Sequence, residues 1–578
     1  MIILGISCYY HDAAACLLHD GCIVAAAQEE RFSRIRHDQG FPRHAIGYCL
    51  AEAGVSIDDV DYVGFYDKPL LKFERILQTY LATWPRSFPS FLKAVPLWLR
   101  KKLWIPNTIN KELGFEGDVL MAEHHMSHAA SAFLVSPFDE AAVVTVDGVG
   151  EWTTSTIAHG KKNDVEMLRE TRFPHSLGLL YSAYTYYLGF KVNSAEYKVM
   201  GLAPYGEPKY VDKVLETVAY DDDGGFHMNM KYFAYDYGLR MTNRRFEQLF
   251  GRPRRSPESK LETFHMDVAA SVQRVTEEIV LRMTRHAHEL TGSSNLCMAG
   301  GVALNCVANG RVLREGPFEN MFVQPAAGDA GGAVGVAAYI YHHVLGYERT
   351  SPWQHAFLGP RYSADGIREY LDKTGMHYEE LEESELIERT VQAIEDQKII
   401  GWYQGRMEFG PRALGNRSII ADPRNPENRD RVNLKIKFRE SFRPFAPSVL
   451  EERVSDWFDI DCPSPYMLLV AQVREDRRSI PAVTHVDGSA RIQTVDRVTN
   501  PLYYRLIERF EEKTGCPVLI NTSFNVRGEP IVCTPHDARV CFMRTHMDVL
   551  AIGPFFLRKE DQEKFVEDTD WRDQIALD

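Results

Sequence analysis

The sequence of 578 residues contains neither a long apolar run nor a cysteine pattern typical of secreted proteins. A membrane-spanning helix needs about 20 consecutive apolar residues, so we predict no membrane span. The ten cysteines are scattered, without a C-x-x-C motif, which argues against a disulfide framework and against a cysteine-based zinc site. Since no signal peptide opens the sequence, we expect a cytoplasmic protein with reduced thiols.

Positive charge is also in deficit. The formal net charge is −14 at pH 7, which disfavours general nucleic-acid binding, and we predict no nucleic-acid partner. Charged residues make up 25% and hydrophobic residues 45% of the chain, as in ordinary globular proteins. Because the chain is too long for one hydrophobic core, we expect two or more domains.

The stretch EHHMSHAASAF carries the clearest chemistry. If it is helical, His124 and His128 lie on one face, one turn apart, within reach of a single cation. The run AAVVTV predicts a buried strand, and Asp147 follows it at a glycine turn. Two imidazoles and a carboxylate suit iron, zinc or manganese. The alternative is that the histidines cap or pack the helix. His125 is expected to point away from the pair.

The pattern of strand, loop with Asp, strand, turn and strand occurs twice, first from residue 1 and again from AAVVTVDG. This weak repeat suggests a duplication whose loops clamp the phosphates of a nucleotide. His11 and Asp12 follow the first strand, at the place where α/β sheets bind ligands. His11 could act as a general base. It could equally be a loop residue paired with a neighbouring carboxylate.

Two successive stretches, NLCMAGGVALNCVANG and MFVQPAAGDAGGAVG, indicate a strand, a double-glycine turn and a helix. Such turns let a ligand approach the backbone closely, and a helix N-terminus favours phosphate. Asp329 precedes the second pair of glycines and becomes a candidate fourth metal ligand. The loop NSAEYKVMGLAPYG adds a lysine. The predicted nucleotide-binding residues are Lys198, Gly300, Gly301, Asn305 and Gly331.

Residues 70–106 alternate tryptophans with lysines and arginines, and three prolines interrupt them. One interpretation is an interfacial membrane anchor. The other is a flap over an acceptor site. We favour the flap, because proline at Pro85, Pro89 and Pro96 should break the amphipathic helix that a membrane anchor needs.

Residues 351–362 change in composition and are predicted to link a domain at 1–350 to one at 363–578. Arginine and lysine concentrate beyond the linker among glycines, prolines and aromatics, a composition that suits a pocket for a small phosphorylated substrate. Surface salt bridges or RNA binding are the alternatives. The candidate pocket residues are Arg412, Arg417, Lys437, Arg439, Arg491, Asn521, Ser523 and Arg527. A last helix is expected around 558–566.

Taken together, these stretches resemble the O-carbamoyltransferases of antibiotic (tobramycin, cephalosporin and ansamycin type) and nodulation-factor biosynthesis. The resemblance covers nearly the whole chain. It rests on long motifs in order: HDAAA, QEERFSR, EHHMSHAASAF, VDGVGEW, EYKVMGLAPYG, GGVALNCVANG, FVQPAAGDAGGAVG, EFGPRALGNRSI, KFRESFRPFAPSV, HVDGSARIQTV and NTSFNVRGEPIV. It implies an α/β protein with an N-terminal actin-like (ASKHA) duplicated domain, similar to the tRNA threonylcarbamoyladenosine synthase, and a C-terminal YrdC-like α/β domain.

The resemblance also implies an activity. The C-terminal domain would form carbamoyl-adenylate from carbamoyl phosphate and ATP (with Mg²⁺), and the N-terminal domain would transfer the carbamoyl group to a hydroxyl of a small-molecule acceptor. It implies a divalent metal, Fe²⁺ in preference to Mn²⁺ or Zn²⁺, held by His124, His128, Asp147 and Asp329. His11 matches the proposed general base, and Asp12 stands beside it.

The rival functions are an actin-fold small-molecule kinase and a nucleotide-gated binding module without catalysis. A kinase would not need the His-Asp group or the second basic pocket, and a binding module would tolerate loss of His11. A homodimer is compatible with the sequence, and the acceptor is not specified by any motif.

Overall fold

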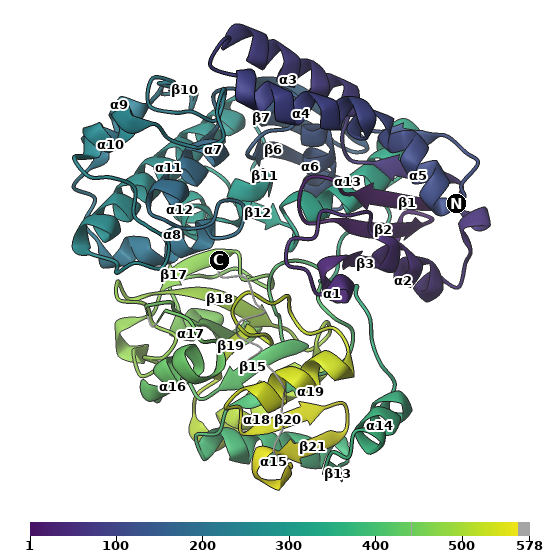
Figure 1. The fold of residues 1–578 in the computed structure, drawn as a ribbon. Helices are drawn as coiled ribbons and strands as arrows, with labels where there is room; N and C mark the ends of the chain where they lie inside the picture. The colour runs from purple at the N-terminus through teal and green to yellow at the C-terminus, as the bar shows by residue number, and fades with distance from the viewer. Residues whose placement is uncertain (441, 564–578) are drawn as a thin grey trace. The chain divides into compact units, whose positions relative to one another are not determined.

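The computed structural model describes residues 1–440 and 442–563, which divide into two compact units (Figure 1). Unit 1 comprises Met1–Glu29 and His37–Trp353. Unit 2 comprises Glu30–Arg36 and the chain from Gln354 onward. Within the described ranges, no helix is both long and apolar enough to cross a bilayer.

Unit 1 contains two five-stranded sheets with the same strand order. The first is β3-β2-β1-β4-β5, built from β3 (Cys22–Gln28), β2 (Ala14–His19), β1 (Ile2–Ser7), β4 (Tyr62–Phe65) and β5 (Val119–Met121). In it β1, β2 and β3 form an antiparallel meander, while β4 and β5 run parallel to β1.

The second sheet repeats this plan with β8 (Asp164–Arg172), β7 (Thr153–Lys161), β6 (Glu140–Val146), β11 (Asn295–Ala299) and β12 (Asn320–Val323). Here β6, β7 and β8 are antiparallel, while β11 and β12 run parallel to β6. The repeated order confirms the predicted duplication of an actin-like domain in an α/β protein.

Two central helices carry the functional elements of unit 1. Helix α6 (His124–Phe133) packs on β6 and β11, α13 (Gly332–Ala338) packs on β1 and β2, and the two helices cross each other. The crossing needs a glycine, because a Cβ on Gly335 would lie 1.9 Å from the backbone oxygen of Ser127. The long helix α11 (Thr263–Thr291) ends at the left-handed Gly292, and α12 (Cys306–Glu315) packs against it.

The variant Gly335→Ala is therefore expected to destabilise unit 1. The added methyl must push apart two packed helices, and overpacking of this kind costs about 1–3 kcal/mol. Chemical denaturation followed by circular dichroism should show a lower midpoint. Gly47 provides the control, since it is exposed in helix α2 (Arg43–Ala53) and a Cβ there would meet nothing within 4 Å. Gly47→Ala should leave the midpoint unchanged or raise it; equal losses in both variants would contradict the crossing argument.

Unit 2 is built on a mixed nine-stranded sheet, whose strand order is β13-β21-β20-β14-β15-β19-β16-β18-β17. Its strands are β13 (Glu379–Glu380), β21 (Phe555–Arg558), β20 (Val549–Ile552), β14 (Ile400–Tyr403), β15 (Arg417–Ala421), β19 (Val518–Ser523), β16 (Ala446–Leu450), β18 (Ser489–Val495) and β17 (Leu469–Gln472). The helices α14 (Ala364–Lys373), α15 (Glu383–Glu395), α18 (Pro501–Thr514) and α19 (Pro535–Arg544) complete it. The helix expected around 558–566 does not begin at Arg558, which ends β21, and 564–566 lie outside the described residues.

Unit 2 also includes the seven residues Glu30–Arg36, far upstream in the chain. Phe32 packs against the cluster of Met407, Ala413, Ile531 and Cys533. Arg31 donates a 2.7 Å hydrogen bond to the carbonyl of Gly410. Arg34, at φ 59°, donates to the carbonyls of Pro530 and Ile531 at 2.8 and 2.7 Å. These contacts hold a backbone conformation that a non-glycine residue seldom adopts alone.

The Trp-rich stretch is more helical than the prolines suggested. It forms α3 (Pro69–Ala82), α4 (Phe88–Arg100) and α5 (Ile105–Leu113). Pro85 separates α3 from α4, as predicted. The predicted break at Pro89 and Pro96 is wrong, because Pro89 lies in the first turn, where no backbone donor is lost, and α4 continues through Pro96.

Candidate functional site

Four buried side chains of unit 1 lie close together where helix α6, strand β6 and the turn before α13 meet. His124 and His128 come from α6, Asp147 directly follows β6, and Asp329 begins the short turn that leads into α13. One ligand atom from each lies within 4.8 Å of all the others. The structure thus brings together the four residues that the sequence suggested.

The distances within this group suit a shared cation better than internal hydrogen bonds. His124 Nε2 lies 3.1 Å from Asp147 Oδ2, whereas both imidazoles approach Asp329 Oδ1 only to 3.7 and 3.6 Å. Among the described residues, neither carboxylate oxygen of Asp329 has a hydrogen-bond partner, although both are buried. Two histidines and two carboxylates match the ligand preference of a borderline divalent metal, so the group could hold a metal ion.

Charge within the group is strongly coupled. Burial lowers the pKa of His124, but Asp329 and Asp147 outweigh it and raise that pKa to about 9. Burial opposes ionisation of Asp147, yet His124 and His128 hold its pKa well below the usual range. The two desolvated carboxylates need neighbouring positive charge to stay ionised, a role that a bound metal can fill.

The turn after β6 builds the base of this site. Glu151 is buried and accepts the backbone N–H of His124 at 3.1–3.2 Å, so it caps the start of α6. Gly150 is needed here, because a Cβ would lie 2.9 Å from His124 Cβ. The amide of Gly301 donates to Asp147 Oδ1 at 2.8 Å and orients that carboxylate. His125, as expected, points away and bonds Thr145 Oγ1 at 2.6 Å.

A buried charge network that the sequence did not reveal surrounds the turn. Lys72 of α3 is paired with Asp67, and Arg75 donates to the carbonyl of Gly150 at 3.0 Å. Burial and the neighbouring Asp67 raise the pKa of Glu151. An Asp-x-x-x-x-Lys spacing at the start of α3 was the only available signal, and it is too common to identify a site.

His11 lies beside the four-residue group, in the loop between β1 and β2. Its Nε2 is 3.6 Å from Asp329 Oδ2, and its Nδ1 is 2.9 Å from Asp12 Oδ2. The other oxygen of Asp12 lies 2.7 Å from His37 Nδ1. Asp12, at φ 51°, therefore holds the imidazole by one nitrogen and leaves the other facing Asp329. Burial lowers the pKa of His11, but Asp329 and Asp12 outweigh it and raise that pKa to about 10.

The predicted nucleotide-binding residues are distributed around α8, α12 and α13. Lys198 lies not in a loop, as the sequence suggested, but in helix α8 (Glu196–Leu202), fully buried and with its ammonium 5.7 Å from the Phe190 ring centroid. Gly300, at φ 94°, makes the turn after β11, and Asn305 caps α12 by accepting the N–H of Ala308. Gly331 ends the short turn that begins at Asp329.

In unit 2, Lys437 is the centre of a basic cluster. The residue is buried, and its side-chain nitrogen donates to Asn525 Oδ1 at 2.6 Å, to Ser523 Oγ at 3.1 Å and to the Ser523 carbonyl. Arg527 donates its backbone N–H to the Lys437 carbonyl at 3.1 Å. Burial lowers the pKa of Lys437 well below its usual range, and Arg439, Arg443 and Arg36 lower it further. Such a concentration of positive charge suits an anion.

The other predicted pocket residues of unit 2 belong to different strands of the nine-stranded sheet and to the connections between them. Asn521 of β19 donates to Gln493 Oε1 at 2.7 Å and to Ser448 Oγ at 3.1 Å. Arg417 of β15 is fully buried, donates to the carbonyls of Gln404, Asn416, Pro360 and Gly405, and stacks on Tyr403. Its contacts support the backbone. Arg412 lies in the β14–β15 connection and Arg491 in β18.

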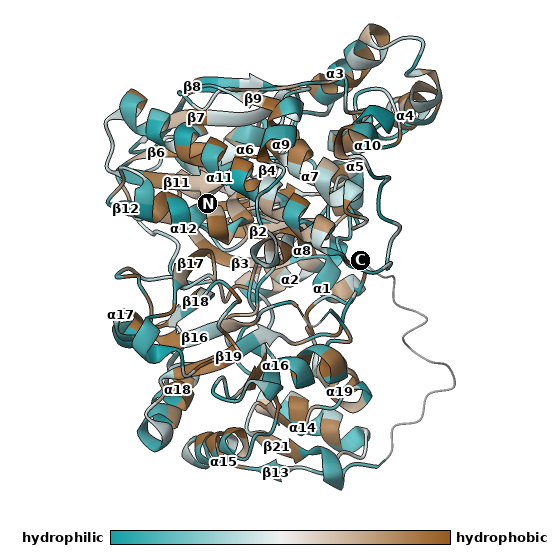
Figure 2. Ribbon diagram, turned by 90° about the vertical axis from the view of Figure 1, so that its left-hand side faces the viewer, coloured by the Kyte–Doolittle hydropathy of each residue, from teal (hydrophilic) through white to brown (hydrophobic). Residues whose placement is uncertain are grey.

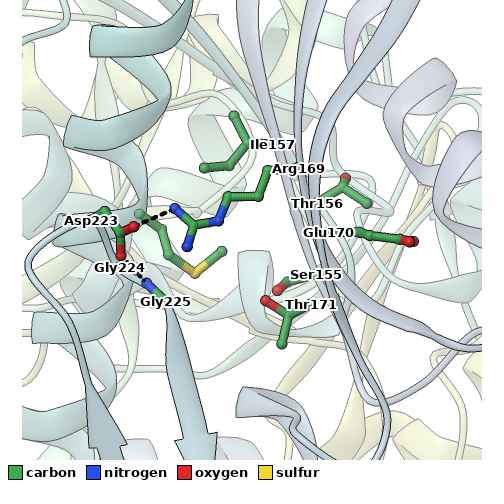
Figure 3. A pocket seen from close by; sticks show the side chains of 10 residues that line it. Ser155, Thr156, Ile157, Arg169, Glu170, Thr171, Asp223, Gly224 and Gly225 are labelled. Carbon is green, nitrogen blue, oxygen red and sulfur yellow. Dashed lines mark hydrogen bonds and ion pairs between the residues drawn. The ribbon is translucent and has the colours of Figure 1, made fainter.

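A small pocket elsewhere on unit 1 contains none of the predicted residues. It lies between β7, β8 and the turn at Asp223–Gly225 (Figure 3). Its cation, Arg169, is already neutralised by Asp223 at 2.6 Å. We therefore place no site there.

Family models match both units. The model described as carbamoyltransferase N-terminus matches residues 2–338, and the model described as carbamoyltransferase C-terminus matches residues 391–559. The chain belongs to the carbamoyltransferase family. This confirms the family resemblance, and the molecule is an enzyme of that family.

Curated relatives extend over most of this carbamoyltransferase. An uncharacterized protein of Synechocystis is 54% identical over 100% of both chains. Nodulation protein NolNO of Sinorhizobium fredii is 39% identical over 95% of this chain and 79% of its own. Nodulation protein U of Rhizobium fredii is 29% identical over 90% of this chain and 89% of its own.

Solved structures show distant likeness. Component A of (R)-2-hydroxyglutaryl-CoA dehydratase from Acidaminococcus fermentans is 14% identical, with a TM-score of 0.33, over 59% of this chain and 97% of its own. HypF of T. kodakarensis is 14% identical, with a TM-score of 0.30, over 58% of this chain and 47% of its own.

Metal binding by the four-residue group can be tested directly. We expect the wild-type protein to bind about one divalent ion and His128→Ala to bind it roughly a hundredfold more weakly or not at all, since loss of even an outer-shell group costs 10–100-fold. Equilibrium dialysis with elemental analysis measures this. His125→Asn, on the same helix but outside the group, should retain the metal. Equal binding by the wild type and His128→Ala would exclude the site.

Proposed function

We propose that this carbamoyltransferase forms carbamoyl-adenylate from carbamoyl phosphate and ATP and then transfers the carbamoyl group to a hydroxyl of a small-molecule acceptor. The observation that carries the proposal is that a chain matched by both family models has a buried His-Asp group beside His11 in unit 1 and a cluster of basic residues around Lys437 in unit 2. A kinase would need only one phosphate site.

The adenylating half-reaction is assigned to unit 2. Carbamoyl phosphate and one water give carbamate and phosphate; the carbamate oxygen then attacks the α-phosphorus of ATP, and pyrophosphate leaves. Lys437, with Ser523 and Asn525 bonded to its ammonium, would hold the negatively charged group. Arg439, Arg491, Asn521 and Arg527 would contribute to the same anion site, with Arg412 as a further donor, since arginine forks match phosphate oxygens. Mg²⁺ would accompany ATP.

Transfer is assigned to unit 1. The acceptor hydroxyl attacks the carbonyl carbon of carbamoyl-adenylate, AMP leaves with the bonding electrons, and the hydroxyl proton passes to His11 Nε2. Asp12 would hold His11 through Nδ1, as a carboxylate orients the base of a catalytic triad. Lys198, Gly300, Gly301, Asn305 and Gly331 would bind the nucleotide part of the adenylate.

His124, His128, Asp147 and Asp329 would hold the divalent metal, for which we favour Fe²⁺ over Mn²⁺ or Zn²⁺. The bound ion would offset the charge of Asp329, which favours a neutral His11, and would polarise an oxygen of the reacting group. Asp329 would thus serve both the base and the metal site, and the protein's own contribution is to hold His11 Nε2 at 3.6 Å from the Asp329 carboxylate.

The test requires no knowledge of the acceptor. Purified protein is incubated with ATP, carbamoyl phosphate and Fe²⁺ or Mn²⁺, and the products are analysed by mass spectrometry. Carbamoyl-adenylate and pyrophosphate are the expected products. ADP without pyrophosphate would favour a kinase instead, and no turnover with either metal would favour a binding module.

A further inference from the structure

The helical pair α3–α4 lies at the periphery of unit 1 (Figures 1 and 2). Its inner side is an ordinary core of Phe73, Val95 and Trp98, with Ile76, Leu77, Tyr80, Phe91, Ala94 and Leu103 packed around it. Large apolar side chains nevertheless remain on the outside. These exposed side chains are Leu70, Leu81, Trp84, Phe88, Leu92, Leu97, Leu99 and Trp104.

The exposed residues of α4 form a stripe. Phe88, Leu92 and Leu99 are spaced by four and seven residues, so they project from one side of the helix, and they are 45%, 55% and 51% exposed. Val95, four residues before Leu99, lies at the inner edge of this stripe and is buried in the pair together with Trp98. The apolar face of α4 is thus wider than its core contacts, and the exposed part of that face is a surface still to be covered.

The charged residues within this stretch of the chain have one sign. From Arg75 to Lys111 the chain contains no aspartate or glutamate, while Arg86, Lys93, Arg100 and Lys101 are exposed. Lys93 and Arg100 are seven residues apart, so they flank the stripe on one side. This cluster stands out on a chain with a net charge of −14. Apolar and aromatic side chains flanked by lysine and arginine are the composition of surfaces that bind anionic bilayers.

The pair is firmly attached to unit 1. Ser90 donates to the carbonyl of Tyr237 at 3.0 Å, Arg86 lies over the Tyr237 ring, and Lys102 donates to the carbonyl of Tyr9 at 3.0 Å, two residues before His11. The exposed stripe is therefore presented by a supported helix.

We propose that α3–α4 docks unit 1 on the surface of an anionic phospholipid membrane, with Phe88, Leu92 and Leu99 entering the acyl boundary and Lys93 and Arg100 meeting the headgroup phosphates. The helix would lie in the interface and would not span the bilayer. The proposal does not depend on the assigned reaction.

The test uses the full-length protein and two kinds of vesicle, phosphatidylcholine alone and phosphatidylcholine with added phosphatidylglycerol, separated by flotation. Wild-type protein should bind the anionic vesicles and not the neutral ones, and high salt should release it. The double variants Leu92→Asp/Leu99→Asp and Lys93→Glu/Arg100→Glu should each bind at least about tenfold more weakly, since each basic residue near the surface contributes about fivefold.

Leu290→Asp is the matched control, because Leu290 is exposed on helix α11, also in unit 1, to the same 45% as Phe88. It should bind like the wild type. Circular dichroism and thermal unfolding establish that all variants fold. In a second measurement, brominated lipids should quench wild-type tryptophan fluorescence more than that of Trp84→Phe/Trp104→Phe.

Wild-type protein that binds neither vesicle, or stripe variants that bind like the wild type, would overturn the proposal. So would a concentration-dependent dimer in analytical ultracentrifugation that Leu92→Asp/Leu99→Asp abolishes without any vesicle binding; the stripe would then be covered by a second copy of the chain.

Discussion

His11→Asn should leave carbamoyl-adenylate formation intact and slow carbamoyl transfer by about 10²–10⁴-fold, the usual contribution of a general base. Asparagine keeps a polar group near Asp12, which lies 2.9 Å from His11 Nδ1, but cannot take up the acceptor proton. The measurement compares pyrophosphate release with product formation, using a hydroxylated acceptor that the wild-type enzyme carbamoylates.

A second variant distinguishes a catalytic role of His11 from a structural one. His11→Gly leaves space for added imidazole, which should restore part of the transfer rate if His11 acts as the base. His19→Asn, at an exposed position on β2, should behave like the wild type. An equal loss of adenylation and transfer in His11→Asn, without rescue by imidazole, would indicate a structural role, and an unchanged transfer rate would exclude the base assignment.

Lys437→Ala should abolish adenylation, with a loss of about 10²–10³-fold as for removal of a preorganised donor to a developing anion. The side-chain nitrogen of Lys437 is buried and bonded to Ser523 and Asn525, so alanine removes the donor that these two residues hold in place. Pyrophosphate release measures the effect. Lys435→Ala, two residues away and exposed, is the control and should retain full activity.

The same lysine predicts a pH dependence. Burial and three arginines hold its pKa low in the free protein, and a bound anion would raise it. Between the two pKa values binding must take up a proton, so the affinity for carbamoyl phosphate should fall as the pH rises through that window. Calorimetry in buffers of different ionisation enthalpy detects the proton uptake. Lys437→Met should lack it; proton uptake that persists in this variant would belong to another group.

Much of unit 1 could be predicted from its sequence because its signals are local. The spacing of His124 and His128 needs only a helix, and the position of Asp147 needs only the end of a strand. The duplication was visible as a repeated order of strand and loop, and the common strand order of the two sheets confirms it.

The interior ionic contacts could not be predicted in this way. Glu151 caps α6, Gly301 donates to Asp147, and Lys72 pairs with Asp67, yet none of these contacts has a characteristic spacing. Arg417 illustrates the opposite problem. A basic residue among glycines suggested anion binding, whereas its guanidinium donates to four backbone carbonyls. Composition shows that a charge is present but not which group neutralises it.

The packing of Glu30–Arg36 into unit 2 has a consequence for how the chain is made. Phe32 and Arg34 contact residues around 530, so the segment leaves the ribosome about 500 residues before its partners do. At about 5–20 residues per second that interval lasts roughly 25–100 s. Throughout it, the sheet of β1, β2 and β3 can form while the turn that follows β3 remains without its packing partners. Packing of the Glu30–Arg36 segment is thus completed only after the residues around 530 have been synthesised.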